Sequence, residues 1–206
     1  MLVIIDYGVG NVRSVTNAFR HIGADIVVSC RTEDIEKASG LILPGVGASG
    51  YAMERVAPIA ELICRQARTG KPFLGICLGY QILFEISYEL GEYQCLGLIG
   101  GSVIPIPAGR TIPHMGWNKV IPAAGMRLFA GMEQGKHFAF AHSFYAKVED
   151  PAACVATTEY EGLSLTAAVE KGNIFGVQFH PEKSGNDGLA VLRNFVGICQ
   201  EAKQPC

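Results

Sequence analysis

One cysteine of this sequence has the surroundings of a nucleophile. Cys77 stands in the stretch Gly-Ile-Cys-Leu-Gly (75–79), which follows the apolar residues Phe73 and Leu74 and precedes an apolar-rich segment that runs to Ile86. This order predicts a strand, a sharp turn and a helix, the arrangement of a nucleophile elbow. At the N-terminus of such a helix, the dipole and unpaired N–H groups favour the thiolate. The alternative interpretation is an inert buried cysteine packed between two glycines.

A cysteine nucleophile needs a base and a group that orients the base, and the segment His180-Pro181-Glu182 can supply both. Proline favours an extended conformation of the residue before it, and in an extended chain side chains two positions apart point to the same side. Glu182 is therefore expected to lie behind His180, where it would fix the tautomer and stabilise the imidazolium. The alternative is a strand-end histidine followed by a solvated glutamate.

The other four histidines have less favourable surroundings. His21 falls near the end of the first expected helix, where a solvated position is the simplest interpretation. His114 and His137 fall in loop-like stretches without an adjacent acid. His142 could line a pocket, but hydrogen-bonded packing is the default role for such a residue. His180 is therefore the predicted base.

Acyl chemistry also needs N–H donors for a developing oxyanion. One candidate is the backbone N–H of Leu78, and the other is the turn Pro-Gly-Val-Gly-Ala-Ser-Gly (44–50). The turn also matches the dinucleotide pattern G-x-G-x-x-G, but that fingerprint follows the first strand and is joined by an acid about 20 residues later, whereas residues 69–71 read Thr-Gly-Lys. The sequence has no Walker A motif or zinc-ligand cluster, so no cofactor and no metal site are predicted.

Strands and helices alternate in the first half of the chain. Strands are predicted at 2–6, 26–28, 41–43 and 73–76, the third ending at Pro44. Asn11 and Thr32 are expected to cap helices, and Pro58 to open a longer one that closes at Gly70. Continuous apolar strands with helical connections indicate an open, mostly parallel, doubly wound α/β sheet, with its site beyond the C-terminal ends of the strands.

The second half has a different pattern. Residues 96–148 contain short apolar pieces broken by glycine, proline and asparagine, which favours a smaller region of antiparallel strands and loops. Segments 153–157, 164–170 and 173–179 predict a strand meander. The closing helix carries Leu189, Leu192, Phe195, Val196 and Cys199. No linker or repeat interrupts the pattern, so residues 1–206 are expected to form a single domain.

The composition limits the classes of partner that the protein can have. Hydrophobic residues make up 49% and charged residues 17%, against about 25% charged in an average globular protein, so the chain has either a large core or an apolar surface that a partner covers. The net charge of −2 indicates neither nucleic acid nor anionic lipid as a ligand. Seven dispersed cysteines, no secretory signal and no long apolar run predict reduced thiols in a soluble, cytoplasmic protein.

Taken together, Gly-Ile-Cys-Leu-Gly, Pro-Gly-Val-Gly and His-Pro-Glu resemble class I (triad) glutamine amidotransferases, whose fold is flavodoxin-like. Three further stretches, at 6–11 (Asp-Tyr-Gly-Val-Gly-Asn), 114–118 (His-Met-Gly-Trp-Asn) and 176–184 (Gly-Val-Gln-Phe-His-Pro-Glu-Lys-Ser), resemble the glutaminase subunits of imidazole glycerol phosphate synthases. The resemblance runs from residue 1 to the final helix and implies one glutamine amidotransferase type 1 domain.

The resemblance implies a mechanism. Cys77 would attack the side-chain amide of L-glutamine, His180 would take the thiol proton and pass it to the departing ammonia, and Glu182 would orient His180. Water would then hydrolyse the γ-glutamyl thioester. The backbone groups implied to hold the oxyanion are those of Val46, Gly47 and Leu78, and the residues implied to bind glutamine are Gln81 and Glu89 on the elbow helix and Ser143.

The resemblance also implies a partner. In the family, ammonia passes to a (β/α)₈-barrel cyclase subunit, which makes imidazole glycerol phosphate and the aminoimidazole carboxamide ribotide of purine synthesis, so a heterodimer of histidine biosynthesis is expected. Asn11, Trp117 and Lys183 match positions that face this partner. The family's aromatic-rich run before His142 is replaced by Ala139-Phe140-Ala141, which changes the passage between the subunits. The chain alone is expected to be nearly inactive, because the turn at 45–47 need not present its N–H without the partner.

Two other functions share parts of the pattern. A glutaminase of another pathway, such as that of pyridoxal phosphate synthase, would carry the same triad but lack His-Met-Gly-Trp-Asn. A peptidase or stress protein of the DJ-1/PfpI type also has an elbow cysteine, but a histidine typically follows it, and here Leu78 does.

Overall fold

The protein is described over residues 1–202 by a computed structural model. Its strands are β1 (Leu2–Ile5), β2 (Ile26–Ser29), β3 (Leu41–Gly45), β4 (Phe73–Cys77), β5 (Ile86–Ser87), β6 (Tyr93–Gln94), β7 (Gly101–Pro105), β8 (His114–Pro122), β9 (Lys136–His142), β10 (Phe144–Val148), β11 (Cys154–Tyr160), β12 (Leu163–Lys171) and β13 (Ile174–Val177). Its α-helices are α1 (Val12–His21), α2 (Thr32–Lys37), α3 (Ser49–Arg68), α4 (Leu78–Gln81) and α5 (Gly185–Glu201), and two 3₁₀ turns are η1 (Arg127–Phe129) and η2 (Pro181–Lys183).

Nine strands form one sheet in the order β2-β1-β3-β4-β13-β12-β11-β8-β9. The strands from β2 to β13 pair in parallel, and those from β13 to β9 pair antiparallel. A second sheet has the order β10-β7-β5-β6. The predicted α/β class, parallel sheet and C-terminal meander are confirmed. The sequence did not indicate that β13 continues the parallel half, nor that the meander extends the same sheet.

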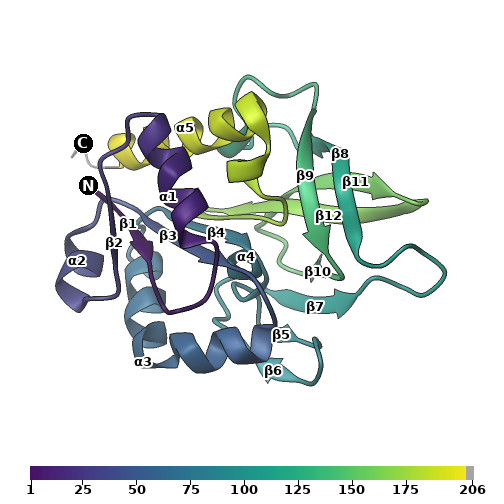
Figure 1. Cartoon of the computed structure of the whole chain (residues 1–206), viewed down its shortest axis with the longest axis horizontal. Coiled ribbons are helices and arrows are strands. Elements are labelled where there is room, and N and C mark those ends of the chain that lie inside the picture. Colours follow the sequence, from purple (N-terminus) through teal and green to yellow (C-terminus); the bar gives the residue numbers. More distant parts are fainter. Residues whose placement is uncertain (203–206) are drawn as a thin grey trace.

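The parallel strands are buried on both faces, which explains why their sequences are continuously apolar. In β1, Leu2 and Ile4 belong to the core beneath α1 and α5, whereas Val3 and Ile5 belong to the core on the opposite face with α2 and α3. Figure 1 shows α1 and α5 over one face of the sheet and α3 over the other. The sheet is therefore a rigid platform whose C-terminal strand ends are its open edge.

Two predicted helix caps are wrong in detail. Asn11 does precede α1, but its side chain makes no capping hydrogen bond. Thr32 is the first residue of α2, and Arg31 occupies the N-cap position. Arg31 and Ser29 both hydrogen-bond to Asp34 in the first turn of α2, and these bonds stabilise a helix start one residue before the one expected.

The predicted start of the third helix is also wrong, because α3 begins at Ser49 and contains Pro58 in its interior. The buried residues Ala52, Val56 and Ile63 follow helical spacing through the proline. Pro58 itself is exposed, so the carbonyl that loses its N–H partner can be hydrated, and burial of the apolar face outweighs this loss. Strand β3 likewise runs past the predicted end at Pro44 to Gly45, where it pairs with Cys77.

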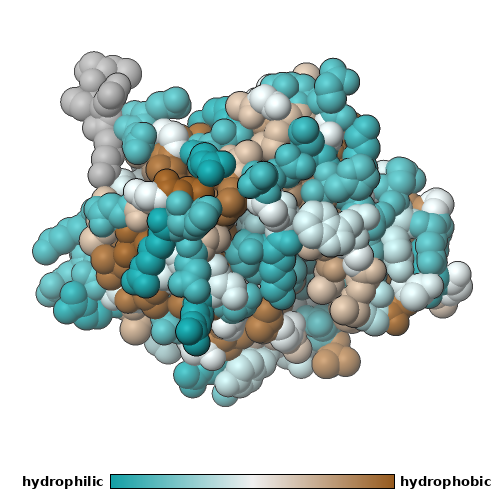
Figure 2. All heavy atoms as spheres, turned by 45° about the horizontal axis from the view of Figure 1, so that its top comes forward, coloured by the Kyte–Doolittle hydropathy of each residue, from teal (hydrophilic) through white to brown (hydrophobic). Residues whose placement is uncertain are grey.

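The surface of the protein is partly hydrophobic, as the low fraction of charged residues in the sequence suggests. Figure 2 shows one face on which hydrophilic side chains surround separate hydrophobic patches. Within residues 1–202, no helix combines the length and the apolar character needed to cross a membrane. Cysteines 30, 64, 77, 95 and 154 have free thiols, and Cys206 lies outside the described residues.

The close contact of β3 with the segment after Cys77 is expected to dominate the stability of the elbow. A Cβ on Gly79 would overlap the carbonyl oxygen of Leu43, whereas a Cβ on Gly197 in α5 would meet no atom within 4 Å. Gly79→Ala should lower the free energy of unfolding by about 1–3 kcal/mol, and Gly197→Ala should raise it by up to about 1 kcal/mol through helix propensity. Urea unfolding of the full chain measures both, and equal values for the two variants would contradict this account.

Candidate active site

The sequence around Cys77 folds as a sharp turn at the end of β4. Cys77 has φ +54° and ψ −108°, a left-handed conformation that costs a non-glycine residue about 1–3 kcal/mol. A Cβ on Gly75 would lie 2.6 Å from the carbonyl oxygen of Gly79, so glycine is required where the chain doubles back. The helix that follows, α4, ends at Gln81. It is much shorter than expected, and its dipole contributes correspondingly little at Cys77.

His180 and Glu182 lie together as expected, but through a different local geometry. His180 is extended (φ −99°, ψ 96°), whereas Pro181 to Lys183 form the turn η2. This turn brings Glu182 Oε1 to 2.9 Å from His180 Nδ1. Both side chains are buried, and Glu182 Oε2 has no hydrogen-bond partner within residues 1–202. The pair is therefore buried, with His180 Nδ1 engaged by the carboxylate.

The strand β9 holds the base in place. The N–H of His180 donates to the carbonyl of Ala139 (2.9 Å), and Ser184 Oγ donates to the carbonyl of His180 (2.6 Å) while accepting from the N–H of Ala139 (2.9 Å). This closed set of bonds fixes the backbone on both sides of the imidazole. Because Glu182 engages Nδ1, Nε2 is the ring nitrogen available for the interaction of His180 with Cys77.

The charge of His180 follows from its two neighbours. Burial alone would lower the pKa of His180, but its hydrogen bonds and charge interactions with Cys77 and Glu182 raise the pKa to about 10. At neutral pH His180 is therefore an imidazolium placed between Cys77 and the Glu182 carboxylate.

The substitution Glu182→Gln tests this electrostatic account. Without the carboxylate, the pKa of His180 should fall from about 10 by about 1 or more, because an opposite charge at hydrogen-bonding distance is lost. NMR titration of the His180 imidazole in the full chain measures the pKa. Glu149→Gln, a surface change at an ion pair with Lys147, is the control and should leave it unchanged. An unaltered pKa in Glu182→Gln would contradict the assignment.

A cavity of about 260 Å³ opens above the elbow. It is walled by the ends of β3 and β4 and by the β9–β10 junction. The predicted site residues that line it are Val46, Gly47, Cys77, Leu78, Gln81, Glu89, Ser143, His180 and Lys183. Glu182 lies behind His180, and Asn11 and Trp117 are not among the lining residues. Segments that are far apart in the sequence therefore meet in one hollow.

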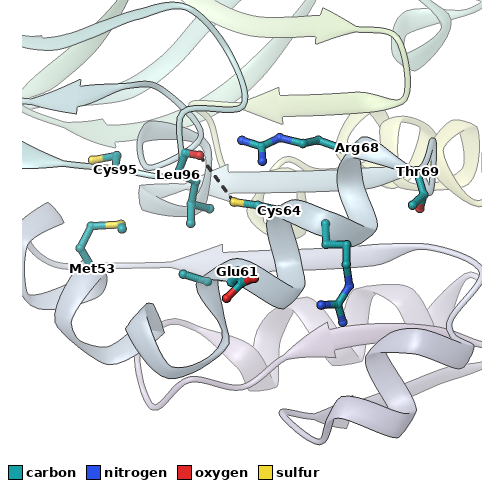
Figure 3. Close-up of a pocket in the computed structure, with 9 residues that line it drawn as sticks. Met53, Glu61, Cys64, Arg68, Thr69, Cys95 and Leu96 are labelled. Carbon is teal, nitrogen blue, oxygen red and sulfur yellow. Dashed lines mark hydrogen bonds between the residues drawn. The ribbon is translucent and has the colours of Figure 1, made fainter.

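A larger hollow of about 570 Å³ lies elsewhere, along α3. Figure 3 shows Cys64 and Cys95 on its wall, with Cys64 Sγ hydrogen-bonded to the carbonyl of Leu96 at 3.5 Å. Burial raises the pKa of both thiols, that of Cys95 to about 12. Both stay protonated at neutral pH, and among the described residues no histidine lines this hollow. Size alone therefore does not identify the reactive site.

Glu89 does not lie on the elbow helix, as the sequence suggested, but follows β5. Its Oε2 accepts hydrogen bonds from the N–H (2.7 Å) and Oγ (2.9 Å) of Ser49, the first residue of α3. The Oγ of Ser87 donates to that of Ser49 at 3.0 Å. The carboxylate thus joins the β5 hairpin to the helix that follows the glycine-rich turn, at the rim of the cavity.

Three histidine expectations need correction or detail. His114 and His137 were expected in loops, but His114 begins β8 and His137 lies in β9. The two strands form an antiparallel ladder in which His114 pairs with His142 and His137 with Lys119. His114 is buried, and its Nδ1 lies 2.9 Å from His142 Nε2. His142 lines the cavity, its Nδ1 donates to the carbonyl of Phe144 (2.8 Å), and burial lowers its pKa to about 4. It is a neutral, hydrogen-bonded wall residue.

Comparison with known proteins identifies the family. A family model described as glutamine amidotransferase class-I matches residues 3–198. The chain belongs to this family. Its relatives include the imidazole glycerol phosphate synthase subunit HisH of Methanothermobacter thermautotrophicus, with 50% identity over 96% of this chain and 98% of that protein. The subunit of the same name from Pyrococcus furiosus is 44% identical over 94% and 97% of the two chains.

Solved structures of this glutamine amidotransferase fold agree with the architecture. PurLQS from Thermotoga maritima superposes with a TM-score of 0.75 at 24% identity, covering 96% of this chain and 97% of that one. A crystal structure described as glutamine amidotransferase has a TM-score of 0.77 at 19% identity, over 96% and 98% of the chains. At these identities the likeness shows the fold.

Two residues of this amidotransferase site were not found by sequence reasoning. Gln178 is fully buried, and its Nε2 lies 3.9 Å from Cys77 Sγ. Its position two residues before His180 in an extended segment was an available signal. Tyr7 donates its hydroxyl to the carbonyl of Pro44 at 2.9 Å, and burial, followed by the charge of Cys77, raises its pKa. Only the folded structure places Tyr7 under the glycine-rich turn.

Proposed function

We propose that this chain is the glutaminase subunit of an imidazole glycerol phosphate synthase. It would hydrolyse L-glutamine in the cytoplasm and deliver the ammonia to a cyclase subunit in a heterodimer of histidine biosynthesis. The observation that carries the proposal is the near full-length similarity to subunits of that name in a chain whose Cys77 and His180 share one cavity. Both this similarity and the family match favour it over a DJ-1/PfpI-type protein, and the relatives' names favour it over other glutaminases.

The proposed reaction begins from a thiolate–imidazolium pair. Cys77 Sγ attacks the amide carbon of glutamine, the C–S bond forms, and the carbonyl electron pair moves to oxygen. When the C–N bond breaks, His180 donates its proton to nitrogen and ammonia leaves. His180, now neutral, takes a proton from water, which attacks the thioester and releases glutamate. Glu182 stabilises each imidazolium that forms in this cycle.

The oxyanion would lie between the turn after β3 and the start of α4. The backbones of Val46, Gly47 and Leu78 border the cavity at Cys77. Gly47 has φ +101°, and no atom lies within 4 Å of the position of its Cβ, so the Val46–Gly47 peptide has room to turn its N–H towards the substrate. A partner that holds the Val46–Gly47 peptide with its N–H directed at the substrate would activate the enzyme.

Glutamine would bind in the rest of the cavity. Glu89 supplies a carboxylate at its rim for the α-amino group of the substrate, and Gln81 and Ser143 offer an amide and a hydroxyl. These groups surround Cys77 from α4, from the segment after β5 and from the β9–β10 junction. A free amino acid, with both charges and a terminal amide, matches this set.

The same edge of the molecule offers a surface for the cyclase. Trp117 is 59% exposed and Met115 is 70% exposed on β8. Trp117 pairs with Ala139 of β9, whose carbonyl accepts from the N–H of His180. With Lys183 exposed on η2, this surface adjoins the proposed source of ammonia. The small Ala139 leaves the passage wider here than an aromatic residue would.

Cys77→Ala should abolish glutamine-dependent turnover by the assembled synthase while ammonium salts still support the cyclase reaction, because the thiol serves only amide hydrolysis. Steady-state assays of the complex with each nitrogen source measure the two activities. Cys30→Ala, at an exposed cysteine, is the control and should retain both. Glutamine-driven turnover that persists in Cys77→Ala would refute the proposal.

Trp117→Ala should weaken association with the cyclase by about tenfold or more, since a large exposed aromatic at the centre of an interface is a typical hot spot. Leu90→Ala is the matched control. Leu90 is 82% exposed on the segment between β5 and β6, and its truncation should change the dissociation constant little. Calorimetric titration of one subunit with the other measures the dissociation constant. Similar losses of affinity in both variants would contradict the proposed interface.

A further inference from the structure

A chain of amide groups leads from a backbone carbonyl to the nucleophile. Gln81 Nε2 lies 3.1 Å from the carbonyl oxygen of Phe144 and 3.0 Å from Gln178 Oε1. Gln178 Nε2 in turn lies 3.9 Å from Cys77 Sγ. Gln81 is 5% exposed and Gln178 is not exposed at all. The chain is therefore shielded from water, and each of its members must find its partners within the protein.

The carbonyl of Phe144 determines the orientation of both amides. A backbone carbonyl can only accept, so Gln81 must turn its NH₂ group towards Phe144. The same NH₂ group contacts Gln178, and the atom of Gln178 that faces it must be the accepting oxygen. The NH₂ group of Gln178 is thereby directed at Cys77 Sγ. The opposite orientation of Gln178 would bring two NH₂ groups together and place a carbonyl oxygen against the sulfur.

A donor at this point bears directly on the charge of the sulfur. Cys77 is 8% exposed, and a thiolate taken out of water needs donors to replace its hydration. His180 supplies one from the side of the base. A hydrogen bond to the charged form of a group favours that form, and an N–H directed at the sulfur also helps the thiolate to depart from a thioester.

We propose that Gln178 is a catalytic residue, the second hydrogen-bond donor to the Cys77 thiolate, and that Gln81 holds it in the donating orientation. The catalytic part rests on the proposed glutaminase function. In acylation, Gln178 keeps the sulfur ionised until the C–S bond forms. In deacylation, the C–S bond breaks, its electron pair returns to sulfur, and the Gln178 N–H stabilises the departing thiolate. Gln81 is a positioning residue in this arrangement, besides its proposed contact with glutamine.

Two substitutions separate a donor from a structural role. Gln178→Glu keeps an oxygen that can accept from Gln81 but replaces the NH₂ group with a second oxygen facing the sulfur. Gln178→Met removes both polar groups at similar volume. If Gln178 acts as a donor, Gln178→Glu must impair Cys77 more than Gln178→Met, because a carboxylate and a thiolate repel each other. If Gln178 only braces Gln81, Gln178→Met leaves the alkylation rate of Cys77 unchanged, whereas the carboxylate of Gln178→Glu still repels a thiolate.

The readout is alkylation of Cys77 by iodoacetamide in the full chain, followed across pH by mass spectrometry of the Cys77 peptide. At pH 7 the rate should fall by about tenfold or more in Gln178→Glu, as expected for loss of a hydrogen bond to a charged group, and by less in Gln178→Met, with both profiles moved to alkaline pH. Gln134→Glu and Gln134→Met, at an exposed turn position, are the matched controls and should leave the rate unchanged.

Alkylation requires no glutamine, so it tests the donor independently of the proposed activity. An unchanged rate in Gln178→Met would overturn the inference, because the repulsion in Gln178→Glu arises whether or not Gln178 is a donor. If Gln178→Glu fails to fold, an unchanged rate in Gln178→Met still overturns it and a slower rate supports it. The expected alkylation order in a chain that never hydrolyses glutamine with its partner would refute the proposed function and leave the donor assignment standing.

Discussion

The approach of β3 to the segment after Cys77 is the constraint on which the rest of the site depends. The carbonyl of Leu43 occupies the space that a side chain at position 79 would need, and Gly45 is paired with Cys77. At this close approach the chain leaves β4 through a left-handed turn at Cys77. That turn places the sulfur at the common edge of the parallel strands, where the segment after β3 would supply the proposed donors and the segment after β13 the proposed base.

The buried charges at this edge stabilise one another. Burial disfavours each charged form, yet His180 gains a proton because Cys77 and Glu182 flank it. Gln178 reaches the sulfur from the same extended segment. The site therefore holds an imidazolium beside the Cys77 sulfur before substrate arrives. The proposed reactivity of Cys77 would follow from the hydrogen-bond donors placed around its sulfur.

The antiparallel half of the sheet connects the proposed partner surface to the candidate active site. Trp117 is exposed on β8 and pairs with Ala139 of β9. The carbonyl of Ala139 accepts the hydrogen bond from the N–H of His180. A partner that binds Trp117 would therefore contact the strand pair of β8 and β9, and the backbone of β9 is hydrogen-bonded to His180. The proposed delivery of ammonia and a response of the active site to the partner would both use this pair.

The sequence by itself determined the parallel α/β core and the candidate triad. Buried parallel strands read as continuous apolar runs, and local motifs such as 75–79 and 180–182 place reactive groups through short-range geometry. It could not show that α4 ends at Gln81, that α3 passes through Pro58, or that η2 turns Glu182 back onto His180. It also could not reveal the Gln81–Gln178 chain or the Glu89–Ser49 bonds. These contacts join residues far apart in the chain, and only the packing of the sheet and its crossovers brings them within hydrogen-bonding distance.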